Sequence, residues 1–155
     1  MICVLDTNVI VNSINNNLDC HSIMILFYVN RELKIGIDYN GKILKEYHDN
    51  CSRDEFFRKW YQELQNKGQI EYRDGKLDSA IKISLKNLGF HEEEDTFFVA
   101  VALNSDKNLI TEDSDYGKGN SEKAEKNQKI LEFMKKNLNL NIMNYCEGLD
   151  FLKNL

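Results

Sequence analysis

Four acidic residues stand beside apolar runs in four separate parts of the chain, and residues of this type suit metal chemistry. They are Asp6, Glu46, Asp95 and Asp113. Hard divalent cations such as Mg²⁺ and Mn²⁺ prefer carboxylate oxygen and water as ligands. Such an ion needs several acids from distant segments, so the four residues together predict a site for Mg²⁺ or Mn²⁺.

Asp6 and Asp113 each come at the end of an expected strand. Asp6 follows the apolar residues 1–5, and Asp113 comes shortly after residues 108–111. In open α/β sheets ligands bind beyond the carboxyl ends of the strands, so parallel strands would bring both carboxylates to one edge. Each acid also has a plainer explanation, because a loop aspartate can cap the next segment and residues 113–117 have good turn chemistry.

Asp95 and Glu46 carry weaker signals. Asp95 closes the acidic run of residues 92–95, where an apolar stretch begins. The helix dipole alone also favours acids in a first helical turn. Glu46 lies in an expected helix, where a lone glutamate is usually solvated or ion-paired. Glu46 gains significance because the other three acids need a further partner.

Four neighbouring residues are expected to support these acids. Thr7 and Asn8 can hold the Asp6 carboxylate by hydrogen bonds, and Thr111 stands two residues before Asp113. Asp115, two residues after Asp113, is expected to be an auxiliary or water-mediated ligand. The predicted metal ligands are therefore Asp6, Asp95, Asp113 and Asp115, and the predicted catalytic acids are Asp6, Glu46, Asp95 and Asp113.

Length and composition predict one globular domain spanning residues 1–155. The chain is 42% hydrophobic and 29% charged, it lacks Pro, and its eight Gly mark no linker. The net charge of −5 argues against a broad basic surface for nucleic acid. It does not exclude a nuclease, because bound metal ions neutralise a carboxylate cluster locally.

The cysteines and the N-terminal segment indicate a reduced, cytoplasmic protein. Cys3, Cys20, Cys51 and Cys146 are widely spaced and form no Cys-x-x-Cys pair. The apolar run before Asp6 is too short for a signal peptide or a membrane span. The three histidines are scattered, without the spacing of a zinc helix.

Strands and helices are expected to alternate along the chain. Hydrophobic patterns predict strands at residues 1–5, 33–39, 108–111 and 140–145, and helices at 21–31, 41–50, 77–88, 92–103, 121–137 and 148–155. A further helix is expected between a capping box at 52–55 and Gly68, and a polar loop after Asp6. The predicted fold class is α/β, a three-layer helix–sheet–helix sandwich around a mostly parallel four- or five-stranded sheet.

The four acids and their neighbours resemble the PIN-domain nuclease pattern over residues 1 to about 115. The segments that carry the resemblance are Val4-Leu5-Asp6-Thr7-Asn8-Val9, Leu44-Lys45-Glu46-Tyr47, Asp95-Thr96-Phe97-Phe98-Val99-Ala100 and Leu109-Ile110-Thr111-Glu112-Asp113-Ser114-Asp115. The resemblance implies that Asp6, Glu46, Asp95 and Asp113 hold Mg²⁺ or Mn²⁺ for phosphodiester hydrolysis. The helix expected at 121–137 departs from compact members, and a longer surface helix is its simplest explanation.

The resemblance also implies partners for the chain. It favours RNA as the substrate, single-stranded or structured, and many small stand-alone members are toxins that an antitoxin protein holds inactive. Homodimers are common in the family. No membrane partner is expected.

Two other functions compete with this hypothesis. Aspartate-based, Mg²⁺-dependent phosphatases also place an Asp after the first strand, but they want a second Asp two residues later, where this chain has Asn8. The alternative is a non-catalytic PIN-like scaffold. Four intact acids argue against it, because a module without metal has little reason to gather unpaired carboxylates.

Overall fold

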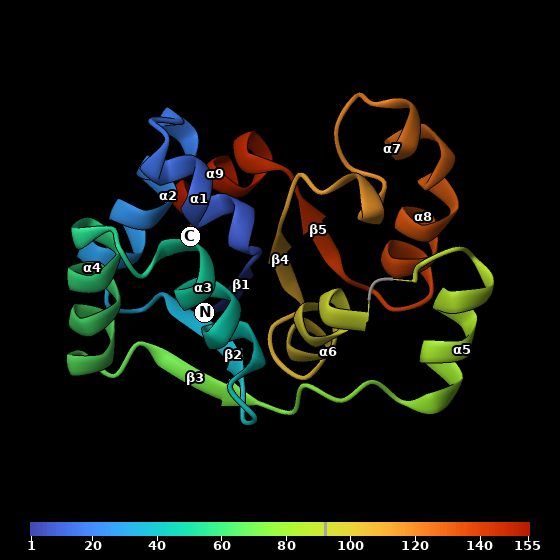
Figure 1. The fold of residues 1–155 in the computed structure, drawn as a ribbon, viewed down its shortest axis with the longest axis horizontal. Helices are drawn as coiled ribbons and strands as arrows, with labels where there is room; N and C mark the ends of the chain where they lie inside the picture. Colours follow the sequence, from blue (N-terminus) through green and yellow to red (C-terminus); the bar gives the residue numbers. More distant parts are fainter. Residues whose placement is uncertain (92) are drawn as a thin grey trace.

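The chain folds around a five-stranded, all-parallel sheet in the computed structural model, which describes residues 1–91 and 93–155 (Figure 1). The strand order is β3-β2-β1-β4-β5. The strands are β1 (Ile2–Leu5), β2 (Lys34–Asp38), β3 (Ile70–Arg73), β4 (Asn108–Ile110) and β5 (Asn141–Met143). The predicted α/β sandwich with a parallel sheet is confirmed.

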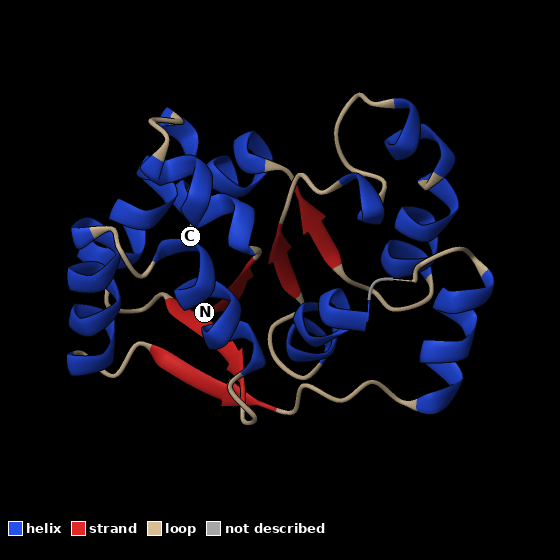
Figure 2. Cartoon of the chain, viewed as in Figure 1, coloured by secondary structure: helices blue, strands red, loops and turns tan. Residues whose placement is uncertain are grey.

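Helices flank both faces of this sheet (Figure 2). They are α1 (Thr7–Ile14), α2 (Leu18–Val29), α3 (Lys42–Cys51), α4 (Glu55–Asn66), α5 (Ser79–Asn87), α6 (Thr96–Leu103), α7 (Glu122–Lys126), α8 (Gln128–Lys136) and α9 (Tyr145–Lys153). Two 3₁₀ turns, η1 (Glu93–Asp95) and η2 (Ser114–Tyr116), precede α6 and α7. In the described part of the chain, every helix is too short or too polar to cross a lipid bilayer.

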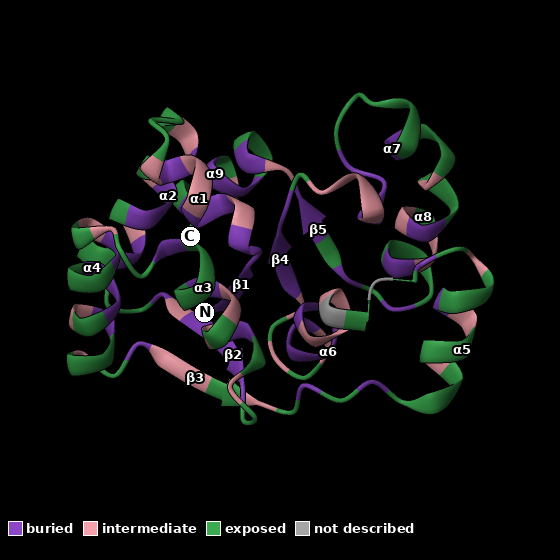
Figure 3. Ribbon diagram, in the orientation of Figure 1, coloured by how far each residue is buried: buried purple, intermediate pink, exposed green. Residues whose placement is uncertain are grey.

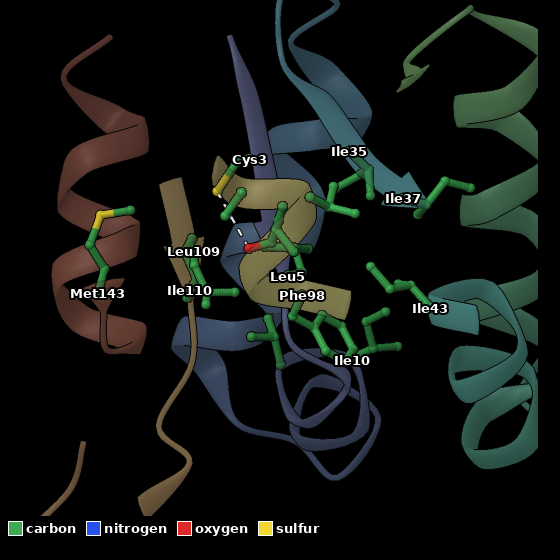
Figure 4. Close-up of a cluster of buried hydrophobic side chains, with 14 of the residues drawn as sticks. Cys3, Leu5, Ile10, Ile35, Ile37, Ile43, Phe98, Leu109, Ile110 and Met143 are labelled. Carbon is green, nitrogen blue, oxygen red and sulfur yellow. Dashed lines mark hydrogen bonds between the residues drawn. The ribbon is translucent and has the colours of Figure 1, made fainter. Parts of the chain in front are cut away.

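The core lies on both sides of the central strands. All four residues of β1 are buried, as expected for a strand that helices cover on both faces, and β4 is buried along its length (Figure 3). Helix α6 packs against β1, β2 and β4, and its Phe98 lies near Leu5 and Ile10 in the core (Figure 4). Gly36 permits this close packing, because a Cβ there would lie 3.0 Å from Val101 Cγ1.

Two elements were not predicted from the sequence. Residues expected to form a polar loop after Asp6 form α1, whose buried residues Thr7, Val9, Ile10 and Ser13 share one helical face. Strand β3 was also missed, because it is an edge strand of only four residues, three half-buried and one exposed. Its pairing with β2 from Ile35↔Ile70 to Asp38↔Arg73 makes it a strand.

Two local predictions were wrong. The capping box at 52–55 is absent, because Ser52 has helical backbone angles and ends α3, while the Asp54 carboxylate accepts the Phe57 N–H at 2.8 Å. The single helix expected at 121–137 is two helices that meet at Asn127. The Asn127 side chain donates to the Ser114 carbonyl at 2.9 Å, which fixes the break beside η2.

The helix predicted at residues 92–103 is a 3₁₀ turn followed by α6. Its expected first residue, Glu92, lies outside the described residues. Asp95 ends the 3₁₀ turn and directly precedes α6. The Thr96 hydroxyl donates to the Glu93 carbonyl at 2.5 Å, which closes this turn. Asp95 is therefore held where the chain enters a buried helix.

Candidate metal centre at the carboxyl edge of the sheet

Parallel pairing of β1 with β4 places Asp6 beside Thr111. Leu5 pairs with Ile110, and the Asp6 N–H donates to the Ile110 carbonyl at 3.0 Å. The next residue on each strand therefore reaches the same carboxyl edge. The Thr111 hydroxyl donates to Asp6 Oδ2 at 2.6 Å, so a side-chain hydrogen bond joins the two segments directly beyond the last backbone pair of β1 and β4.

Asp6 is buried without being used as a helix cap. Its side chain is 4% exposed and stands at the N-cap of α1, yet it makes no capping hydrogen bond. The Asn8 side-chain amide donates to Asp6 Oδ2 at 3.4 Å. The contacts of Asn8 and Thr111 with Asp6 are therefore present, and these side chains help to orient the carboxylate. The backbone N–H of Thr7, the first residue of α1, also favours the ionised form and lowers the pKa of Asp6.

Three further aspartates form a close cluster at this edge. One carboxylate oxygen from each of Asp95, Asp113 and Asp115 lies within 4.8 Å of the other two. Asp113 Oδ1 accepts the Asp115 N–H at 2.8 Å. The Thr111 hydroxyl oxygen accepts the Asp113 N–H at 3.0 Å, so one threonine contacts both Asp6 and Asp113.

Two contacts tie this cluster to the helical layer that contains α6 and α7. The Tyr116 hydroxyl donates to the Asp95 carbonyl at 3.2 Å, which links η2 to the start of α6. The Lys123 ammonium forms an ion pair with Asp115. The backbone positions of the three aspartates are therefore set by packing between η1, η2 and α7.

Glu46 approaches the cluster from α3. The Thr7 hydroxyl donates to Glu46 Oε1 at 2.7 Å, so the residue directly after Asp6 positions a second acid of the site. The next residue in α3, Tyr47, donates its hydroxyl to the Leu5 carbonyl at 2.5 Å. This contact anchors α3 to the end of β1, directly before Asp6.

Burial and mutual repulsion raise the pKa values of these carboxyl groups. Burial, and then the charges of Asp113 and Glu46, raise the pKa of Asp6 to about 7, although the Thr111 hydrogen bond opposes the shift. Burial and the charges of Asp6, Asp113, Asp115 and Glu46 raise the pKa of Asp95 to about 8. Burial also raises the pKa of Asp113. A cation among them would remove this repulsion.

The donor set fits a hard divalent cation. All the clustered donors are carboxylate oxygens, with hydroxyl and amide groups around them, and Mg²⁺ and Mn²⁺ bind such oxygen ligands. Asn8 Oδ1 is buried and accepts no hydrogen bond from any described residue. An unpartnered buried oxygen beside Asp6 is a further acceptor that a hydrated cation would satisfy.

The structure brings all the predicted site residues to one region of the molecule. The charge of Asp95 is coupled to those of Asp6, Glu46, Asp113 and Asp115. Thr7 was expected to hold Asp6, but its side chain donates to Glu46 instead. Tyr116 and Lys123 were not predicted as contributors, because their contacts depend on how η2 and α7 pack.

One lysine beyond the acidic cluster is part of the interior. Lys118 is buried and forms an ion pair with Glu147 at 2.9 Å. Lys118 therefore joins the segment after η2 to the start of α9.

Comparisons with protein-family models, with curated proteins and with solved structures find no match to this chain. The carboxyl edge of the sheet and the five acids around it are therefore the features of this chain that indicate a function.

Proposed function

We propose that the chain is a metal-dependent nuclease that hydrolyses phosphodiester bonds of RNA. The observation that carries the proposal is the convergence of Asp6, Asp95 and Asp113, with raised pKa values, at the carboxyl edge of a parallel sheet. Keeping several carboxylates together and partly buried is costly unless a cation compensates them. RNA as the substrate, in preference to DNA, follows from the resemblance to PIN-domain nucleases.

The site residues have two kinds of proposed role: most bind or orient the metal ion, and one accepts a proton. Asp6, Asp95, Asp113 and Asp115 would hold Mg²⁺ or Mn²⁺ through their carboxylate oxygens. Such an ion lowers the pKa of a bound water and stabilises negative charge on a phosphate. Thr111 keeps Asp6 and Asp113 in register, since its hydroxyl contacts both.

Glu46 is the proposed proton acceptor. It is half-buried, Thr7 orients it, and it lines a cavity of about 200 Å³ beside Phe97 and Phe98. A carboxylate that faces an open cavity can reach a water next to a phosphate bound there. Asp6 is enclosed by comparison, so its role is to hold positive charge.

The competing functions have specific difficulties at this edge. In the phosphatase hypothesis an acid at position 8 would serve as the general acid, but the Asn8 amide donates to Asp6. In the scaffold hypothesis the cluster would have to persist without a cation. The raised pKa values of Asp6 and Asp95 show that this arrangement is unfavourable for the ionised acids.

A cleavage assay tests the proposal directly. Purified protein is incubated with labelled single-stranded RNA or DNA in Mn²⁺, Mg²⁺ or EDTA, beside Asp6→Asn and the control Asp150→Asn. Asp150 is exposed on α9, so its substitution removes the same charge away from the site. We expect metal-dependent cutting by the wild type and the control only. No cutting by folded wild-type protein, or equal cutting by Asp6→Asn, would contradict the proposal.

An inhibitory protein partner extends the same proposal, because the chain resembles the toxin members of toxin–antitoxin pairs. Induced expression of the wild type should then arrest bacterial growth, while Asp6→Asn should be tolerated. Equal growth of the two strains at equal protein levels would count against the toxin role.

A further inference from the structure

A continuous furrow leads away from Glu46 between α3 and α6. The cavity of about 200 Å³ beside Glu46 shares Lys42 and Phe97 with a second cavity of about 480 Å³. The second cavity shares Lys82 with a third, smaller one of about 70 Å³ against α5. Because the cavities have lining residues in common, they form one surface depression, called the α3–α6 furrow below.

The furrow carries positive charge on a protein that is negative overall. Among the described residues, the lining includes the lysines Lys42, Lys45, Lys76, Lys82 and Lys86 and fewer acids, Glu46, Asp49 and Glu93, of which Asp49 is paired with Lys45. Lys42, Lys76 and Lys82 are exposed. None of the three forms an ion pair with any described residue, whereas the ion pairs of the described chain involve other basic residues. Since the net charge is −5, basic groups gathered here indicate an anionic ligand at this place.

The lysines are held on firmly positioned backbone. The buried Asp38 carboxylate accepts the N–H groups of Lys42 and Ile43 at 3.0 and 2.8 Å, which fixes the start of α3. On the opposite wall, the Asn104 side chain donates to the Asp74 carbonyl at 2.9 Å, and Asp78 caps α5. The distance between the two walls is therefore set by the fold.

Phe97 forms the floor where the first two cavities meet. It is half-buried, two residues after Asp95, and lines both cavities. Gly75 lies directly against it, because a Cβ at Gly75 would be 3.3 Å from Phe97 Cδ1 and 2.6 Å from the Asp38 Cβ. An aromatic ring fixed from behind and open to the furrow is a stacking surface next to the acids.

A ligand that carries several negative charges and accessible aromatic rings would match both the lysines and the Phe97 ring. Proteins bind single-stranded nucleic acid by a basic groove that follows the backbone and by aromatic side chains that stack on bases. In a duplex the bases stack on one another and are not available to a side chain. The furrow therefore favours an unpaired strand.

We propose that the α3–α6 furrow binds a single-stranded polynucleotide next to the cleavage position, with a base stacked on Phe97 and phosphates contacted by Lys42, Lys76 and Lys82. The direction of this strand, leading away from Glu46, rests on the proposed nuclease function. The contacts with the strand do not require metal.

Binding in EDTA tests the furrow without cleavage. Fluorescence anisotropy measures the affinity of a labelled 12-nucleotide single-stranded RNA for the wild type, Lys76→Ala/Lys82→Ala, Phe97→Leu and the control Lys129→Ala/Lys153→Ala. The control removes the same charge from exposed positions on α8 and α9. We expect the furrow double variant to bind about 10-fold more weakly and its salt slope to fall by about 1.4, which is 0.7 per lost phosphate contact.

The other measurements distinguish the contribution of charge to binding from the contribution of base stacking. Phe97→Leu should weaken single-strand binding about 5-fold with an unchanged salt slope, because it removes a stacking surface and no charge. The control double variant should stay within about 2-fold of the wild type. A blunt duplex of the same length should bind more weakly than the single strand.

Three results would overturn the furrow proposal: equal losses in the furrow and control double variants, preference for the duplex, or no measurable binding to the wild type. The two proposals fail separately. Metal-dependent cleavage with binding indifferent to the furrow variants would refute the furrow alone. Furrow-dependent binding without cleavage in Mn²⁺ would refute the nuclease alone.

Discussion

Asp6 and Asp38 occupy equivalent places in the fold and are used in opposite ways. Each is a buried aspartate at the carboxyl end of a strand, β1 or β2, just before a helix. Both oxygens of Asp38 accept backbone N–H groups at the start of α3. Asp6 makes no capping hydrogen bond of this kind to α1, and the side chains of Thr111 and Asn8 donate to its carboxylate.

The difference shows what separates a structural acid from a candidate ligand. The hydrogen bonds of Asp38 are completed by the helix that follows it, so that carboxylate is fully committed to the fold. Asp6 instead faces Asp113 and Glu46, whose charges add to the effect of burial on its pKa. Burial alone therefore does not identify a functional aspartate. The identity of the groups that surround it does.

The largest expected effect is on catalysis. Asp6→Asn should lower the cleavage rate by roughly 1,000-fold, the scale found when a group that stabilises reaction charge directly is removed. Asp38→Asn should instead destabilise the fold by about 1–3 kcal/mol, because the amide leaves one helix N–H unpaired. The rate per folded molecule should change by less than about 3-fold. Single-turnover cleavage and urea unfolding measure the two effects.

The contrast between Asp6 and Asp38 would be wrong if the two variants had the opposite effects. If Asp38→Asn abolished cleavage at full stability, or if Asp6→Asn cut normally, Asp6 would have no special place at this edge.

The stability of the metal-free protein should fall as the pH rises. The folded-state pKa of Asp6 is about 7, above the ordinary carboxyl value near 4, so the folded state retains a proton that the unfolded state releases. The stability from this group is complete below about pH 4 and is lost as the pH rises to about 7, by at most about 1.4 kcal/mol per pH unit. Asp95 acts in the same direction.

Urea unfolding in EDTA between pH 5 and pH 8 measures this dependence. Asp6→Asn should flatten the profile and be more stable than the wild type at pH 8, whereas Asp38→Asn should keep the wild-type slope. A wild-type stability that rises from pH 5 to pH 8 would contradict the assigned environment of Asp6.

Mn²⁺ should stabilise the fold through the same acids. Binding at 100 times the dissociation constant adds about 2.7 kcal/mol to the free energy of unfolding. The melting temperature of the wild type and of Asp38→Asn should therefore rise with Mn²⁺, while Asp113→Asn should respond much less. Equal shifts in all three proteins would place the ion elsewhere.

The smallest expected effect concerns Thr111. Thr111→Val keeps the shape but removes the hydroxyl that contacts Asp6 and Asp113, and such losses around a metal site typically cost about 10–100-fold in affinity or activity. Thr111→Ser keeps the hydroxyl and should retain most of the activity. Cleavage rates of the two variants at saturating Mn²⁺ show whether the hydroxyl group matters. If Thr111→Ser were as impaired as Thr111→Val, packing of the side chain would be responsible instead.

Much of the carboxyl edge of the sheet could be predicted, because the sequence patterns that indicate it are local. The apolar run of residues 1–5 identified β1, and the acids at the strand ends followed from its direction. Asp38 shows the limit of this reasoning, because it lies near the end of an expected strand and a sequence alone does not reveal which acid meets helix N–H groups. That distinction depends on the turn from Gly41 into α3, where the chain adopts a positive φ of 75°.

The elements that were missed depend on tertiary contacts. Strand β3 exists through its pairing with β2 and has little apolar pattern of its own. Helix α1 buries Val9 and Ile10, but Asn8 and Asn12 gave its segment the composition of a loop. The break at Asn127 is set by a hydrogen bond to η2, which no helical periodicity would reveal.

Anomalous diffraction from crystals grown with Mn²⁺ would locate the ion that the clustered acids are proposed to hold. We expect a manganese peak bound by carboxylate oxygens of Asp95 and Asp113 and next to Asp6, with none at Asp38. Ordered acids with no peak among them at millimolar Mn²⁺, or a peak only at another surface, would contradict it.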